Sequence, residues 1–211
     1  MRLLSGLILL LSFTSVIAQD DDIPDYRKKW ESFTKVPDKD IKRDLAAFTN
    51  GGIDESAGKL PLRALDPLGY DGKTMKFRGD NMQVFIETGT FDGSKHKLQY
   101  IENTHLQRID SKPFYGDYGK LPKTTITAVI VVFDNKDTLR LPQTAFFDIY
   151  NPDFVFKEGG VEKTFNAVYL SADKTTFYIY LQNRKASDRY EVTWVIRDKK
   201  YLRRVVDYNI L

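Results

Sequence analysis

The stretch Thr124–Phe133, TTITAVIVVF, runs for ten residues without a charged residue, a glycine or a proline. Most of its side chains are β-branched or aromatic, the types that suit a pleated and buried surface. It ends at Asp134–Asp137, DNKD, whose residues favour a turn. These features predict a β-strand. From Ala128 to Phe133 both alternate faces are apolar, so we expect other parts of the chain to cover this strand on two sides.

Strand patterns also dominate the chain around this stretch. Met82–Thr88 and Leu98–Glu102 are expected to form a hairpin around Asp92-Gly93, a strong turn dipeptide. Four later strands with short polar links predict an antiparallel meander: Phe165–Leu170, Thr176–Gln182, Tyr190–Arg197 and Tyr201–Tyr208. The chain is therefore predicted to be mainly β, an antiparallel β-sandwich or barrel-like domain with one or two short N-terminal helices.

Two strands of the expected meander differ in their side-chain patterns. In Tyr190–Arg197, apolar and polar residues alternate, which predicts one face in the core and one face in water. In Thr176–Gln182, Tyr178 and Tyr180 stand on the face opposite to the core. That second face is either an exposed aromatic platform or a surface covered by the N-terminal helices.

Composition divides the chain into four parts. Residues 1–18 combine an early Arg, an apolar run and small residues before a cleavage point, which predicts a signal peptide and export to the periplasm or the extracellular space. Residues 19–50 form a polar segment with short helices, one of them at about 40–48. Residues 51–74 are rich in Gly and Pro and predict an irregular linker or wrap. Residues 75–211 form the β domain.

Charge and cysteine content narrow the possible functions. The chain has 32 basic and 29 acidic residues and no cysteine. Balanced charge and predicted export argue against nucleic-acid binding. The absence of cysteine removes thiolate metal sites and a cysteine nucleophile. We therefore expect no metal and no cofactor. Because the apolar run of residues 3–13 is too short to span a bilayer, we also expect no membrane span after signal cleavage, while the oligomeric state stays open.

Enzymatic alternatives rest on few residues. The chain has two histidines, His96 and His105, and no serine-hydrolase motif. His96 lies between two lysines, a poor place for a metal ion, and His105 follows Glu102 at a spacing that has ligand value only on a helix. The remaining catalytic hypothesis is polysaccharide cleavage by His105 with Tyr115 or Tyr118.

The tripeptide Arg78-Gly79-Asp80 resembles an integrin-type motif but is too short to indicate function. We interpret it as a turn in which Gly79 adopts a left-handed backbone.

The loop Phe114–Pro122, FYGDYGKLP, is the preferred binding candidate. Exposed aromatics on a loop that a rigid scaffold holds are suited to gripping a sugar or a peptide. The expected binding residues are Phe114, Tyr115, Tyr118, Tyr178 and Tyr180. The leading hypothesis is a secreted, non-catalytic module that binds a glycan or a protein surface. The alternatives are a secreted enzyme that acts on a polymer and a structural component of a cell-surface assembly.

Overall fold

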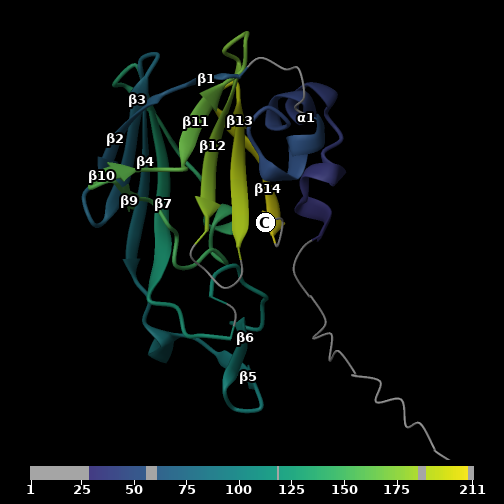
Figure 1. The fold of residues 1–211 in the computed structure, drawn as a ribbon, viewed down its shortest axis with the longest axis vertical. Helices are drawn as coiled ribbons and strands as arrows, with labels where there is room; N and C mark the ends of the chain where they lie inside the picture. The colour runs from purple at the N-terminus through teal and green to yellow at the C-terminus, as the bar shows by residue number, and fades with distance from the viewer. Residues whose placement is uncertain (1–28, 56–60, 118, 185–188, 209–211) are drawn as a thin grey trace, which may run out of the picture.

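Two five-stranded antiparallel sheets face each other in the computed structural model, which describes residues 29–55, 61–117, 119–184 and 189–208. Figure 1 shows the two sheets side by side, with helix α1 on the outer side of one of them. The C-terminal sheet has the order β1-β11-β12-β13-β14, and the middle sheet has the order β2-β3-β4-β7-β8. This arrangement confirms the prediction of a mainly β, sandwich-like domain.

The strands of the C-terminal sheet are β1 (Arg63–Ala64), β11 (Ala167–Leu170), β12 (Thr176–Asn183), β13 (Tyr190–Arg197) and β14 (Lys200–Tyr208). The strands of the middle sheet are β2 (Asp66–Tyr70), β3 (Thr74–Gly79), β4 (Met82–Thr90), β7 (Thr124–Phe133) and β8 (Asp137–Arg140). Two further hairpins pair β5 (Leu98–Ile101) with β6 (His105–Ile109) and β9 (Phe156–Glu158) with β10 (Val161–Lys163). The helical elements are η1 (Lys29–Glu31), η2 (Phe33–Lys35), α1 (Lys39–Leu45), η3 (Asn50–Glu55), η4 (Gly93–Lys95) and η5 (Gln143–Ala145).

The main core lies between the two sheets. Val84, Val129 and Val131 from the middle sheet are in one buried cluster with Val192 and Trp194 from the C-terminal sheet. Because strand side chains alternate between faces, each of these strands sends every second residue into this core. The two inner faces together form the apolar layer that defines a sandwich.

Strand β7 has the predicted bounds, but its second face is not covered as we expected. Val129, Val131 and Phe133 are buried, whereas Ile130 and Val132 on the other face are half-buried. The N-terminal helices pack against the C-terminal sheet instead (Figure 1). On the second face of β7, Ala128 is also buried, so that face is covered only in part.

Residues 29–55, which we call the N-terminal cover, pack on the outer face of the C-terminal sheet. Helix α1 begins after Asp38, whose carboxylate accepts hydrogen bonds from the backbone N–H groups of Asp40 and Ile41. Its buried residues Ile41 and Leu45 join a second apolar cluster with Tyr178, Val195 and Val205 of the sheet. The helix predicted at about 40–48 is thus confirmed, with bounds of Lys39–Leu45.

The cover changes the environment of the strands beneath it. All eight residues of β12 and seven of the eight residues of β13 are buried. The predicted wet face of β13 is wrong, because Glu191, Thr193 and Val195 lie under residues 29–55. For Tyr178 and Tyr180, the alternative of a covered face is confirmed.

The expected hairpin of 82–88 with 98–102 is also wrong. Strand β4 pairs with β3 on one side and β7 on the other, while β5 pairs with β6. The β3–β4 turn is made by Asp80 and Asn81, which both have a left-handed backbone, with φ of 46° and 57°. Gly79 is thus not the left-handed residue of the Arg78-Gly79-Asp80 turn. Asp92-Gly93 opens the short helical turn η4, with Asp92 accepting from the backbone N–H of Ser94.

Residues 51–74 were expected to form an irregular linker or wrap, but they contain regular secondary structure. They include most of η3 and the strands β1 and β2, each of which forms one edge of a sheet. The low apolar content of these edge strands explains why their pattern is weak: β1 and most of β2 are exposed.

The N-terminal cover should contribute strongly to stability. Leu45→Ala removes a side chain with no solvent exposure and should lower the free energy of unfolding by about 2–5 kcal/mol. Urea denaturation followed by circular dichroism measures this change. Lys39→Ala, on the exposed side of the same helix, is the control and should change the free energy by less than about 0.5 kcal/mol. Equal effects of both substitutions would contradict the packing described.

Candidate functional site

A solvent-open cleft of about 250 Å³ lies where the β5–β6 hairpin and the segment after it meet residues 143–150, which we call the 143–150 corner. The residues that line it are His96, Ile109, Asp110, Lys112, Pro113, Phe114, Gln143, Thr144, Phe147, Asp148 and Tyr150. Aromatic, charged and amide side chains thus converge on one concavity.

The corner that forms one wall is held by side chains from the C-terminal sheet. The indole N–H of Trp194 donates to the carbonyl oxygen of Ala145 at 2.8 Å, and the hydroxyl of Tyr190 donates to the carbonyl oxygen of Tyr150 at 3.1 Å. Arg204 binds both carboxylate oxygens of Asp148. Buried donors therefore satisfy the polar backbone of a segment that has little secondary structure of its own.

Asp110 is fixed by a tight turn at the end of β6. Asp110 and Ser111 have positive φ angles of 52° and 63°, and Ile109 and Lys112 exchange backbone hydrogen bonds of 3.0 Å across them. The backbone N–H of Asp110 donates to the carbonyl of Lys97 at 2.8 Å. A two-residue turn of this kind allows little movement, so the carboxylate has a defined position.

His96 and Asp110 form a hydrogen-bonded pair in the cleft. The distance from His96 Nδ1 to Asp110 Oδ2 is 2.7 Å, and the other carboxylate oxygen accepts from the backbone N–H of Lys97 at 2.9 Å. The bond from His96, followed by that from Lys97, lowers the pKa of Asp110. Because a carboxylate accepts at Nδ1, the proton of the neutral imidazole resides there and Nε2 carries the lone pair.

Phe91 packs against both His96 and Tyr150. Its ring stacks on the imidazole with a centroid distance of 4.7 Å, and it meets the Tyr150 ring edge-on at 5.2 Å. Burial, followed by the charges of Asp110 and Asp148, raises the pKa of Tyr150 to about 12. Tyr150 therefore keeps its proton at neutral pH, beside a histidine whose orientation is fixed.

The structure places the five expected binding residues in different environments. Phe114 lines the cleft but is only 3% exposed, and Tyr115 belongs to the main core. Tyr178 and Tyr180 are buried under the N-terminal cover, where their hydroxyls donate to Asp44 and Glu191, each at 2.7 Å. Tyr118 lies outside the described residues.

The exposure that we expected for Phe114 and Tyr115 is therefore wrong, and for Tyr178 and Tyr180 the alternative of an exposed aromatic platform is wrong. Residues 114–116 run inward beside the 143–150 corner, where Tyr115 forms a β-bridge with Ile149. The outer face of β12, which carries Tyr178 and Tyr180, is occupied by the N-terminal cover. A binding role for this region stays a prediction, and within it Phe114 is the residue that faces a cleft.

His105 is not among the residues that line the cleft. It is exposed at the start of β6. Its imidazole packs so closely on Gly119 that a Cβ atom at position 119 would be only 2.5 Å from its Cδ2 atom. His105 is thus outside the cleft, and Tyr115 is in the main core. Sequence reasoning missed His96, because its partner Asp110 is 14 residues away and only the β5–β6 hairpin brings them together.

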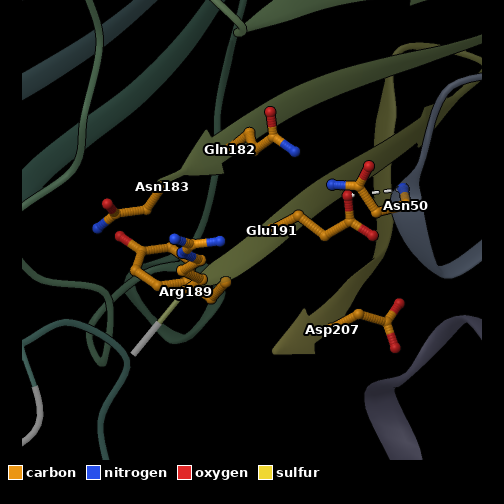
Figure 2. Close-up of a pocket in the computed structure, with 7 residues that line it drawn as sticks. Asn50, Gln182, Asn183, Arg189, Glu191 and Asp207 are labelled. Carbon is orange, nitrogen blue, oxygen red and sulfur yellow. Dashed lines mark hydrogen bonds between the residues drawn. The ribbon is translucent and has the colours of Figure 1, made fainter. Parts of the chain in front are cut away.

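A second, much smaller pocket lies at one end of the C-terminal sheet (Figure 2) and has room for about one water molecule. Gln182, Glu191 and Asp207 form a cross-strand row along its floor. Glu191 accepts from the backbone N–H groups of Asn50 and Gly51, and Asp207 accepts from that of Phe33. These carboxylates anchor the N-terminal cover to the sheet.

Burial raises the pKa of both anchoring carboxyls. For Glu191, desolvation outweighs the hydrogen bonds from Tyr180 and the backbone. For Asp207, desolvation outweighs the bond from Phe33, the charge of Glu191 adds to it, and the pKa rises to about 6. This pocket therefore has a structural role, which is to attach the N-terminal cover to the sheet, and the strength of that attachment depends on pH.

Within the described residues, no group of three or more His, Cys, Asp or Glu side chains is arranged to hold a metal ion. None of the described helices is long and apolar enough to cross a bilayer.

No family model, no curated protein and no solved structure matches this chain.

The attachment of the cover generates a prediction about pH. Since the pKa of Asp207 is higher in the folded chain than its ordinary value of 3.8, its contribution to stability is complete below about pH 4 and is lost as the pH rises through about 6. The free energy of unfolding of the wild type should fall by roughly 2 kcal/mol more than that of Asp207→Asn over this interval. Urea titrations of both proteins at several pH values measure the difference. Parallel pH curves would contradict the raised pKa.

Proposed function

We propose that this chain is an exported module that binds a glycan in the cleft beside His96. The support is the cleft itself, where the rings of Phe147 and Tyr150 lie among the polar side chains of Asp110, Lys112 and Gln143. Sugars present apolar ring faces and many hydroxyl groups, so they bind best where aromatic surfaces alternate with amide and charged groups.

A glycan fits this chain better than a protein surface does. A predominantly apolar interface with a protein partner would present a contiguous patch of large apolar side chains. The exposed large apolar side chains of the described residues instead come from many different elements: Trp30, Ile53, Leu68, Tyr100, Leu121, Val161, Phe165 and Leu202. The convergent polar and aromatic groups are in the cleft, and a concave site favours a chain-like ligand.

Export remains part of the proposal, because the predicted signal peptide, residues 1–18, lies outside the described residues. A non-catalytic role and a catalytic role both begin with binding in this cleft, and binding is the step that its shape and lining support. The role in a cell-surface assembly stays a prediction, without a feature of the described residues that favours it over binding.

Removing the aromatic wall should weaken binding. The wild-type protein, collected from the medium or periplasm of an expression host, is titrated calorimetrically with a panel of neutral and acidic oligosaccharides. For the oligosaccharide that binds, Phe147→Ala should raise the dissociation constant roughly tenfold, the loss expected for one aromatic contact.

Phe165→Ala is the matched control, because Phe165 is another partly exposed phenylalanine and does not line the cleft. It should leave the dissociation constant unchanged. The proposal fails if no member of the panel binds, or if Phe165→Ala weakens binding as much as Phe147→Ala.

A further inference from the structure

The cleft contains a general base that is complete before any ligand arrives. Asp110 holds Nδ1 of His96, and the ring is stacked on Phe91, so Nε2 has a fixed direction. Among the described residues, His96 makes no second side-chain hydrogen bond. A neutral imidazole whose far nitrogen is held by a carboxylate is the standard arrangement for proton abstraction.

The cleft also contains a proton donor. Tyr150 lines the same concavity, and its hydroxyl forms no hydrogen bond with the described residues. Its backbone is held by hydrogen bonds from its own N–H to Tyr115 and from the Tyr190 hydroxyl to its carbonyl. Phe91 touches both Tyr150 and His96. His96 and Tyr150 thus both line the cleft and both pack against the ring of Phe91.

A positive group completes the set. Lys112 follows Asp110 by two residues and lies over the face of the Phe147 ring, with 4.3 Å from Nζ to the ring centroid. Its charge helps to lower the pKa of Asp110, and Gln143 lines the same cleft. These two side chains offer a charge and an amide N–H to an anionic group of a ligand.

Hydrolysis by paired carboxylates does not fit this lining. A glycoside hydrolase of the usual kind needs two available carboxyl groups on either side of the bond. The two acidic residues of the cleft are Asp110 and Asp148. Asp110 is engaged by His96 and Lys97, and both oxygens of Asp148 are bound by Arg204. Both carboxylates therefore serve to position other groups.

We propose that the cleft cleaves a polysaccharide containing uronic acids by β-elimination, with His96 as the base and Tyr150 as the acid. This inference rests on the proposed glycan binding and names the class of glycan. A uronic acid has an acidic C–H bond next to its carboxylate, and Lys112 and Gln143 stabilise the negative charge that develops there when the proton leaves.

The step balances without a cofactor or an added reactant. His96 Nε2 takes the proton from C5 of the uronic acid, and the C5–H electron pair forms the C4–C5 double bond. The bond from C4 to the glycosidic oxygen breaks, and the Tyr150 hydroxyl gives its proton to that oxygen. Proton exchange with solvent then restores neutral His96 and protonated Tyr150. The products are one shortened chain and one chain that begins with an unsaturated uronic acid.

The test incubates the exported wild-type protein with polygalacturonate, alginate and hyaluronan, and with neutral dextran. Ultraviolet absorbance detects unsaturated uronic acid, and mass spectrometry shows whether water has been added to the products. We expect absorbance to grow with at least one acidic polymer and not with dextran. His96→Gln and Tyr150→Phe should each lower the rate at least about 100-fold, the usual contribution of a general base or acid.

Two further variants separate positioning from folding. Asp110→Asn should lower kcat about tenfold or more and leave KM nearly unchanged, because Asp110 orients His96 and is not expected to touch the substrate. His105→Gln is the matched control, since His105 is a histidine outside the cleft, and it should retain the wild-type rate. Circular dichroism spectra that match the wild type show that each variant is folded.

The outcomes distinguish the two proposals. If calorimetry shows binding of an acidic polymer but no unsaturated product forms, elimination is wrong and glycan binding stands. Products that contain an added water would also overturn elimination. If His96→Gln keeps the wild-type rate, the assignment of the base is wrong. If no polymer or oligosaccharide binds, both proposals fail.

Discussion

The structure depends on how side chains of the C-terminal sheet satisfy polar groups on both sides of it. On the inner side, Trp194, Tyr190 and Arg204 donate to the 143–150 corner and hold it against the sandwich. On the outer side, Glu191 and Asp207 accept from the backbone of residues 29–55. Each unmade bond would leave a buried polar group at a cost of about 1–3 kcal/mol. The sheet therefore fixes the cover and one wall of the cleft together.

Local residue patterns predicted the elements better than their partners. The bounds of β7 and the C-terminal meander follow from β-branched runs separated by short polar links. The hairpin pairing of 82–88 failed because Asp92-Gly93 resembles a hairpin turn but begins a 3-10 turn, while the less conspicuous Asp80-Asn81 makes the tight turn. Sequence patterns left open whether the N-terminal helices cover the outer face of Thr176–Gln182, because an apolar face does not identify its partner.

The candidate site was less predictable than the fold. Aromatic residues of the 114–122 loop were expected at the surface, yet Tyr115 is in the main core and Phe114 is nearly buried. A tyrosine or phenylalanine is common in both settings, so composition alone does not distinguish them. His96 was considered only as a metal ligand, because its pairing with Asp110 depends on the β5–β6 hairpin and its stacking on Phe91 depends on the fold. An incorrect prediction of strand pairing therefore also hides the His96–Asp110 pair, which forms only when β5 pairs with β6.

The bonds between the N-terminal cover and the last two strands join the two ends of the chain. Phe33 is 174 residues from Asp207, and Gly51 is 140 residues from Glu191. A growing chain on the ribosome presents the first of these segments long before its acceptors exist. The apolar side chains of helix α1 therefore remain exposed until nearly the whole polypeptide has emerged. Contacts of such long sequence separation form slowly, and for this protein chaperone capture of the early segment would have its greatest value during synthesis.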